Sequence, residues 1–400
     1  MRVAVIGAGV VGITTAYYLH ERGCDVTVFE AESAPASQSS NANGGQLSYS
    51  FTDAMADPAL VPKIVGILLG KDPAFRIHPN MNLDFVRWGL GFLRNCTQRQ
   101  AISNSHNLLR IALKSAKLMQ HFHERFGKFY SHRRAGKLIL LPDKPSALLR
   151  HRTMLKSREG SDARIISIEE AREIEPALCH WASQPAGAIF SEGDEVGDSR
   201  KFAETLEEHL SKSGVRFKFK CPVFAIETSK GRLTKLTTKD SSMSVDAVVV
   251  CAGITSRSLL KPLGLNLPIY PVSGYSVTLP LSSNSPCTSI TALDQKIVLS
   301  RINGSLRIAG FADFNVRPKY QTGRIDRMVQ LASKMAPHAA DYSAVNQHRW
   351  TGHRPMTPNS LPIVGASKVP GVYVNAGHGM LGWTLCAATG DAVSREILAD

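Results

Sequence analysis

The chain has 400 residues, of which 43% are hydrophobic and 20% charged, a balance typical of a globular protein. Its length favours two domains over a single small core. The 47 basic and 33 acidic side chains give a net charge of +14, which could attract an acidic substrate, anionic lipid or nucleic acid, although a solvated basic surface is the simpler interpretation. No arginine-rich block or basic run with interleaved aromatic residues is present, so we predict no nucleic-acid partner.

The cysteine pattern favours a cytoplasmic protein. The seven cysteines include no Cys-x-x-Cys pair, as expected of reduced thiols. His121 and His123 point in different directions on an expected helix, so we interpret them as packing or surface residues and predict no metal site. The chain opens on an expected strand, which argues against a signal peptide. The apolar run 64–70 is too short to cross a bilayer but could lie on one face of it.

The first thirty residues predict a dinucleotide-binding β-α-β unit. An apolar strand, 3–6, is followed at G-x-G-x-x-G spacing by Gly7, Gly9 and Gly12. A helix from about Val10 to Arg22 would direct its N-terminal amides at phosphate groups. The second strand ends on Glu30, 18 residues after Gly12, where a carboxylate binds a ribose hydroxyl.

The next segments are less regular. Residues 33–50 are small and polar, and because the first domain has barely begun there, we expect them to wrap a cofactor rather than form a free linker. Residues 51–80 predict a proline-punctuated loop, and its part 51–75 is interpreted as a segment that faces a membrane, gates the substrate or simply packs. Residues 83–127 have helical spacing.

The middle of the chain alternates strands and helices. Strands are expected at 136–142, 215–220 and 223–227, with helices at 145–158, at 167–176 behind a Ser167–Glu170 capping box, and from about Asp198 to 211. Residues 245–253 repeat the opening signal, a buried strand that ends in Ala252-Gly253.

The last third predicts an antiparallel layer and then a return to the first domain. Strands are expected at 270–279, 296–301 and 305–310, a helix at 322–336, an irregular stretch at 350–358, and short strands at 362–364 and 372–375. A glycine turn at 377–383 leads into a helix that begins at Thr384.

These elements predict an α/β fold with a Rossmann-like nucleotide domain that is split in sequence and a substrate domain of antiparallel sheet and helices. We assign 1–50, 145–268 and 346–400 to the nucleotide domain, and 51–144 and 269–345 to the substrate domain.

Four segments resemble bacterial FAD-dependent D-amino-acid dehydrogenases of the D-amino-acid oxidase and glycine oxidase group. They are Ser40-Asn-Ala-Asn-Gly-Gly-Gln46, Tyr270-Pro-Val-Ser-Gly-Tyr275, Thr351-Gly-His-Arg-Pro-Met-Thr-Pro358 and Gly377-His-Gly-Met-Leu-Gly-Trp-Thr384. The resemblance implies FAD as cofactor, hydride transfer from the α-carbon of a D-amino acid, hydrolysis of the imino acid to a 2-oxo acid and ammonia, and electron transfer to a quinone-type acceptor.

The resemblance and the motifs together imply a set of site residues. Arg354 would grip the substrate carboxylate, which suits the guanidinium fork. Tyr275 is either a wall of the site or a packing residue, and His378 either assists the flavin or shapes its turn. The cofactor residues would be Gly7, Gly9, Val10, Val11, Gly12, Glu30, Ala31, Ser39, Ser40, Gly44, Gly45, Gln46, Leu47, Val223, Ala252, Gly253, Gly379, Met380, Leu381, Gly382, Trp383 and Thr384.

Three alternative functions stay open at this point. The substrate could be a cyclic D-imino acid such as D-proline or cis-4-hydroxy-D-proline. The enzyme could be an oxidase of glycine or a secondary amine, or the chain could be a flavin-binding subunit of a larger complex. The expected location is the cytoplasm, with peripheral contact at the inner face of the cell membrane as an addition.

Overall fold

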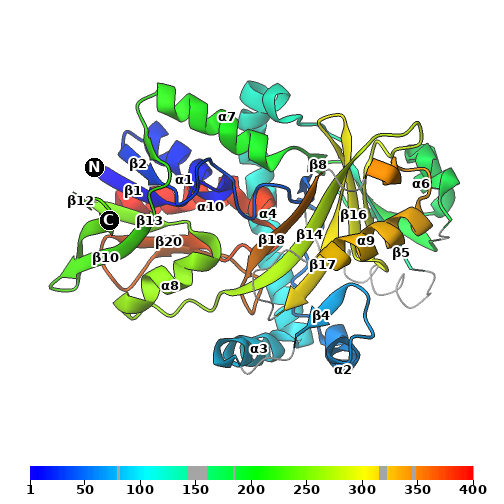
Figure 1. Ribbon diagram of the computed structural model, residues 1–400, viewed down its shortest axis with the longest axis horizontal. Helices are drawn as coiled ribbons and strands as arrows, with labels where there is room; N and C mark the ends of the chain where they lie inside the picture. Colours follow the sequence, from blue (N-terminus) through cyan, green and yellow to red (C-terminus); the bar gives the residue numbers. More distant parts are fainter. Residues whose placement is uncertain (79–81, 143–159, 183–184, 315–321, 345–347, 400) are drawn as a thin grey trace.

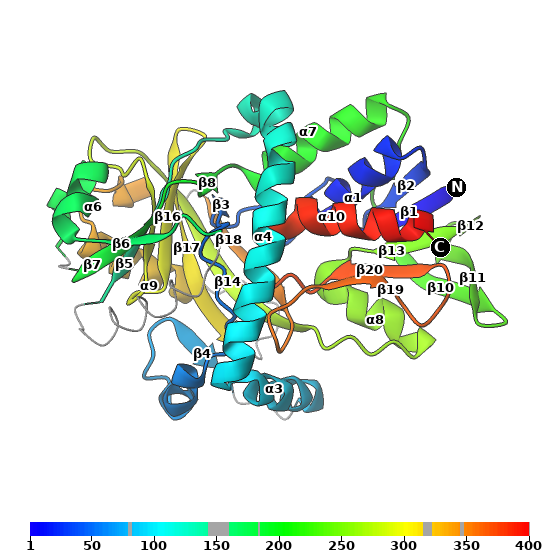
Figure 2. The same ribbon diagram turned by 180° about the vertical axis from the view of Figure 1, so that it is seen from behind.

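The computed structural model describes residues 1–78, 82–142, 160–182, 185–314, 322–344 and 348–399. Two large sheets lie next to each other, and the long helix α4 (Gln98–Phe126) runs along the boundary between them (Figures 1 and 2). The helix expected at 145–158 falls outside the described residues. Within the described part of the chain, no helix combines the length and apolar character needed to cross a bilayer.

The six-stranded sheet contains the predicted β-α-β unit and is parallel except at one edge. Its order is β19-β20-β13-β1-β2-β9, with only β19 antiparallel to its neighbour. The bounds are β1 Arg2–Ile6, β2 Asp25–Phe29, β9 Arg216–Lys218, β13 Ala247–Val250, β19 Ile363–Ala366 and β20 Val372–Ala376. The strand at 245–253 therefore pairs directly with β1, as its repeated signal predicted.

Both faces of this sheet are covered, which explains why its strands are continuously apolar. One face packs against α1 (Val10–Glu21), α7 (Ser199–Lys212) and α10 (Gly382–Ala399). The other packs against α8 (Ser256–Leu260) and a small sheet of β10 (Val223–Ser229), β11 (Arg232–Thr238) and β12 (Ser242–Ser244). Figure 1 shows α7 and α8 on opposite sides of the sheet.

The nine-stranded sheet is mostly antiparallel and forms the second layer. Its path is β18-β14-β17-β16-β15-β5-β7-β6, and β4 also pairs with β17. The bounds are β4 Phe75–Ile77, β5 Lys137–Leu141, β6 Arg164–Ile166, β7 Gly187–Ser191, β14 Tyr270–Pro280, β15 Ser289–Ala292, β16 Ile297–Ile302, β17 Ser305–Phe314 and β18 Arg349–Met356. Helices α6 (Ile168–Ile174) and α9 (Thr322–Met335) pack against it.

The expectation of irregular structure at 350–358 was wrong, because most of that stretch is strand β18. β18 lies at the end of the sheet and pairs only with β14 along the path. Pro355 lacks an N–H group, but an edge strand needs hydrogen bonds on one side only, so proline is tolerated there.

The expected helical stretch at 83–127 is two helices, α3 (Leu83–Asn95) and α4. The break falls at Cys96-Thr97, where the Thr97 hydroxyl accepts a hydrogen bond from the Gln100 amide and caps α4. The cap expected at Ser167 is present at the start of α6, and of the two candidates for the cap of α7, Asp198 and Ser199, Asp198 accepts the hydrogen bond from the Arg200 amide. The remaining short elements include α2 (Ile64–Leu68), the 3-10 helix Gly127–Tyr130 after α4, and the ribbon of β3 (Gln46–Leu47) with β8 (Glu195–Val196).

Some strands belong to a different sheet from the one that the expected domain ranges imply. Strands β6 and β7 lie within 145–268 but pair inside the nine-stranded sheet, and so does β18 within 346–400. Helix α4 lies within 51–144 but packs on α10 in the core of the six-stranded layer. Asp391 joins α10 to two other helices, since it pairs with Arg22 at the end of α1 at 2.6 Å and with Lys114 of α4 at 2.9 Å.

Candidate active site

A cavity of about 1200 Å³ is lined by residues of both layers. It extends from the ends of β1 and β2, past the start of α10, to the face of β14 and β18. Ordinary small-molecule pockets have volumes of roughly 300–1,000 Å³. This cavity therefore has room for a dinucleotide and a small substrate together.

The phosphate end of the cavity is built by the opening glycines. Gly7 has a φ of +104°, which only glycine adopts readily. A Cβ on Gly12 would lie 1.8 Å from the Gly7 carbonyl oxygen, so Gly12 lets α1 pack against the turn. The Val10 amide donates to the Ser40 hydroxyl at 3.3 Å, which places the 33–50 segment across the N-terminus of α1. These features fit a pyrophosphate cradle.

Glu30 follows β2 and lines the same cavity. Its carboxylate accepts hydrogen bonds from the amides of Ala8 at 2.7 Å and Glu32 at 2.9 Å. Val223 lines the cavity next to it. A fixed carboxylate at this position fits the ribose of a bound nucleotide.

The other end of the cofactor path is the start of α10. Residues 379–384 line the cavity, and the Thr384 hydroxyl accepts a hydrogen bond from the Ser48 amide at 3.1 Å. The positive end of the helix dipole therefore faces the cavity, where it would stabilise a negatively charged flavin ring. The His378 ring is buried and bonds Thr389 of α10 at 3.0 Å, and burial lowers the His378 pKa to about 3. The ring also lines the cavity, so its position is compatible with shaping the turn or with contact to the flavin.

Two facing glycines form the floor of the substrate end. Gly274 of β14 pairs with Gly352 of β18. A Cβ on Gly274 would lie 2.5 Å from Nη2 of Arg354, and a Cβ on Gly352 would lie 1.8 Å from the Trp350 ring. Trp350 and Arg354 therefore lie over a patch of sheet that has no side chains of its own.

The Arg354 guanidinium is held by a strained residue. Its Nη1 donates to the Phe311 carbonyl at 2.6 Å, and Phe311 has a φ of +58°, rare outside glycine. Burial lowers the Arg354 pKa to about 10, so the side chain stays charged at neutral pH. Within the described residues this is its one hydrogen bond, which leaves most of its five N–H donors for a ligand.

Tyr275 lines the cavity with its ring, while its hydroxyl points into a buried ion pair. The hydroxyl donates to Asp313 at 2.8 Å, and Asp313 pairs with Arg324 at 2.6 Å. Burial and the neighbouring Asp313 charge raise the Tyr275 pKa, so the phenol stays protonated.

The cavity brings together nearly all of the residues expected from the sequence. Arg354, Tyr275, His378 and twenty of the cofactor residues line it. Two expected residues do not: Gly12 lies beneath the Gly7 turn, and Leu47 is fully buried in the core of the six-stranded layer.

Sequence reasoning missed Lys137, which also lines the cavity. Its ammonium donates to the Ser48 hydroxyl, and burial lowers the Lys137 pKa despite the opposing effect of Asp194. Burial raises the Asp194 pKa to about 6, although Lys137 and two backbone amides act against this shift. The only sequence signal was a lysine at the head of the buried strand Leu138–Leu141. Gly274 and Gly352 were also missed, although glycine within a strand often marks close backbone approach.

The split parallel sheet, the phosphate cradle and the cavity define a flavin-dependent oxidoreductase. The family model described as FAD dependent oxidoreductase (DAO) matches residues 2–396. The chain belongs to this family, and its cofactor is FAD.

Relatives cover essentially the whole chain. It is 31% identical to a D-amino acid dehydrogenase of Vibrio atlanticus over 99% of this chain and 96% of the relative. It is 33% identical to a D-amino acid dehydrogenase of Neisseria meningitidis over 96% of this chain and 93% of the relative.

Solved structures confirm the fold. Glycine oxidase from Geobacillus kaustophilus superposes with a TM-score of 0.78 at 23% identity, over 100% of this chain and 95% of the other. L-proline dehydrogenase from P. horikoshii also gives 0.78 at 19% identity, over 100% of this chain and 93% of the other.

Proposed function

We propose that the enzyme oxidises D-amino acids to 2-oxo acids and ammonia and passes the electrons to a quinone-type acceptor. The observation that carries this proposal is the charged Arg354 guanidinium in the cavity, over the bare floor of Gly274 and Gly352. The whole-chain likeness to proteins named D-amino acid dehydrogenase supports the substrate class.

Arg354 acts by binding and orienting the substrate. A carboxylate accepts two parallel N–H bonds from a guanidinium, which fixes the direction of the Cα–H bond. In the described part of the chain Arg354 forms no salt bridge, and the nearby Asp313 is already paired with Arg324, so the guanidinium can pair with a substrate carboxylate.

Bound FAD supplies the two-electron acceptor for the hydride of the α-carbon. The nitrogen lone pair forms the C=N bond as the hydride leaves, so a substrate that enters as the free amine needs no general base in this step. Water then adds to the imino acid and releases ammonia. The start of α10 would stabilise the charge left on the cofactor.

Anaerobic bleaching of the flavin absorbance tests this reaction. We expect bleaching with D-amino acids and none with their L-isomers. Including D-proline, cis-4-hydroxy-D-proline, glycine and sarcosine in the panel identifies the substrate class. Peroxide release equal to turnover would replace the quinone-type acceptor with oxygen, and flavin without any turnover would indicate a binding subunit.

The Arg354→Met variant tests the role of the arginine. Loss of a charge-assisted pair in a desolvated site costs about 2–4 kcal/mol, so KM should rise by about 30- to 1,000-fold. The Arg354→Lys variant should recover part of the loss, because a lysine keeps the charge without the fork. A near-normal KM in Arg354→Met would remove the residue from this role.

An exposed apolar surface supports contact with a membrane that holds the acceptor. Helices α2 and α3 lie at the same end of the molecule (Figures 1 and 2). Their exposed apolar side chains are Val65, Leu68, Leu83, Val86, Leu90 and Leu93, with Leu69 just after α2. Exposed Lys63, Lys71, Arg87 and Arg94 surround them, as suits anionic lipid. Leu60 and Lys63, just before α2, also line the cavity, which connects this surface to the site.

Vesicle sedimentation tests this contact. The protein should bind vesicles that contain anionic lipid and should be released by high salt. A Leu68→Asp/Leu69→Asp variant should stay in the supernatant yet retain activity with a soluble artificial acceptor. Equal binding by this variant would exclude α2 as the contact surface.

A further inference from the structure

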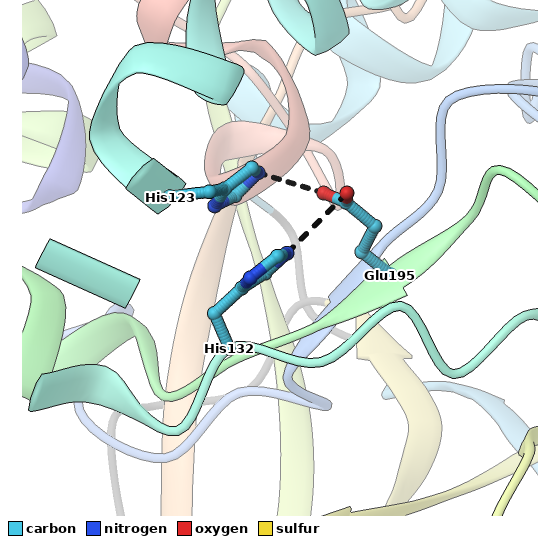
Figure 3. A group of neighbouring side chains, drawn as sticks. All are labelled: His123, His132 and Glu195. Carbon is cyan, nitrogen blue, oxygen red and sulfur yellow. Dashed lines mark ion pairs between the residues drawn. The ribbon is translucent and has the colours of Figure 1, made fainter. Parts of the chain in front are cut away.

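Two histidines and a glutamate form a cluster outside the cavity, which we call the His2Glu cluster (Figure 3). His123 comes from α4, His132 follows the turn of 3-10 helix after α4, and Glu195 lies in β8. Nε2 of His123 is 2.7 Å from one carboxylate oxygen, and Nε2 of His132 is 3.3 Å from the other. The three side chains are 6%, 13% and 8% exposed.

These contacts are ion pairs when the histidines are protonated. Both Nε2 atoms are shielded from solvent, and within the described residues neither has a partner with hydrogen-bond geometry. The two rings stack in parallel with centroids 3.6 Å apart, so both nitrogens face the same carboxylate side by side. The cluster therefore holds three possible metal-ligand atoms close together.

We propose that His123 Nε2, His132 Nε2 and Glu195 bind a divalent transition metal of the zinc class. The three donor atoms lie within 4.8 Å of one another. Zinc–nitrogen and zinc–oxygen bonds of about 2.0–2.2 Å place the ligands of one ion roughly 3.4 Å apart, so modest movements suffice. The rings must tilt out of their stack for both lone pairs to reach one ion. Water completes the tetrahedron.

The surroundings already orient the ligands. His123 Nδ1 lies 2.6 Å from the Tyr130 hydroxyl, which frees Nε2 to bind metal when Nδ1 carries the proton. The Tyr49 hydroxyl donates to a Glu195 oxygen at 3.3 Å. Arg134 covers the carboxylate, with Nε 3.7 Å from Glu195, but its side chain is 73% exposed and can move aside. Entry under Arg134 gives the ion a path from solvent.

The position of the cluster indicates a structural role. Glu195 pairs with Leu47 across the β3–β8 ribbon, and Gln46 of the same ribbon lines the cavity. Tyr130 packs edge-on against Trp383 at the start of α10, with ring centroids 6.1 Å apart. A bound ion would tie α4, the turn after it and β8 together behind the cavity wall without touching substrate.

Metal binding to the flavin-loaded, chelator-treated protein tests the proposal. We expect one equivalent of Zn²⁺ to bind with micromolar or tighter affinity in calorimetry and to raise the thermal midpoint. Co²⁺ should give visible bands to the red of the flavin absorbance, as expected for a tetrahedral site, and Cu²⁺ should show coupling to two nitrogens in electron paramagnetic resonance.

Variants locate the site. His132→Ala and Glu195→Gln should abolish binding, while His106→Ala, an exposed histidine on the same α4, should bind normally. Tyr130→Phe should weaken binding by about 10–100-fold, and Arg134→Ala should retain or tighten it. Absence of stoichiometric binding by the parent protein overturns the proposal, as does binding that survives His132→Ala. The Co²⁺ and Cu²⁺ spectra of the parent decide the matter if the buried variants do not fold.

Discussion

Replacing Gly274 by alanine should displace the Arg354 guanidinium while leaving the cofactor site intact. The added Cβ would lie 2.5 Å from Nη2 and 2.6 Å from Cζ of Arg354. Ordinary contacts at this position need roughly 3.5 Å, so the guanidinium must move by about 1 Å. Gly274 has no positive φ that alanine would strain, although the register between β14 and β17 shifts at this residue.

The kinetic effect follows from this displacement. A shift of about 1 Å in a positioning group costs about 100-fold in rate, and a weakened charge-assisted hydrogen bond costs about 1.5–3 kcal/mol. We therefore expect kcat/KM to fall by about 10–100-fold, with FAD still bound. The free energy of unfolding should change little or rise slightly, since glycine within a strand is worse than alanine by about 0.5–1 kcal/mol.

Anaerobic stopped-flow reduction of the flavin measures this effect on substrate affinity and on the rate of reduction separately. Gly323→Ala is the matched control, because a Cβ there meets nothing within 4 Å. The change in kcat/KM that it causes should correspond to no more than about 0.5 kcal/mol. In an Arg354→Met background, Gly274→Ala should cost almost nothing further. An equal penalty in both backgrounds would refute the view that Gly274 acts through Arg354, as would normal kinetics in the single variant.

Three further predictions follow from the fold. Gly12→Ala should destabilise the protein by about 1–3 kcal/mol and release FAD on gel filtration, because the new Cβ meets the Gly7 carbonyl oxygen, whereas Gly323→Ala should stay yellow. His378 stays neutral in the folded protein down to about pH 3, but takes up a proton below about pH 6.5 when unfolded, so stability falls as pH falls through this window. His378→Gln should remove about 2 kcal/mol of the stability loss between pH 7.5 and 5 in urea titrations, and exposed His106→Gln should not. Arg324→Met should lower the free energy of unfolding by about 3–5 kcal/mol, because it removes the arginine that pairs with the buried Asp313 and leaves only the Tyr275 hydroxyl and the more distant His78; a loss below about 1 kcal/mol in chemical denaturation would contradict this.

The cofactor half of the site could be predicted from the sequence because its determinants are local. The strand, the three glycines, the helix and Glu30 lie within thirty residues, and each has a fixed place in a β-α-β unit. Local signals of the same kind, an apolar run that ends in Ala252-Gly253 and the glycine turn at 377–383, predict the return strand β13 and the turn before α10. Each of these segments carries its own signal in consecutive residues.

The substrate end could not be derived in the same way. Arg354 was identified by resemblance alone, since its neighbours suggested an irregular loop rather than strand β18. Its contact with Gly274 joins residues that are 80 positions apart, and depends on the register of β14 against β18. The His2Glu cluster likewise assembles from three segments. Its sequence spacing carries no ligand signature, and His123 was interpreted as a packing or surface residue.

Phe311 contacts two arginines, Arg354 through its carbonyl and Arg324 through its ring, and only Arg324 forms a salt bridge among the described residues. A positive φ outside glycine costs about 1–3 kcal/mol, which the surroundings must offset. The Arg324 guanidinium lies 4.5 Å from the centre of the Phe311 ring, pairs with Asp313 two residues further on, and donates to the Pro73 and Ala74 carbonyls. Because Asp313 is already neutralised by Arg324, the carbonyl of Phe311 can orient Arg354 without a protein carboxylate taking its charge. Arg324 is therefore used up by Asp313 and the neighbouring carbonyls, whereas Arg354 keeps most of its N–H donors for the substrate carboxylate that we propose.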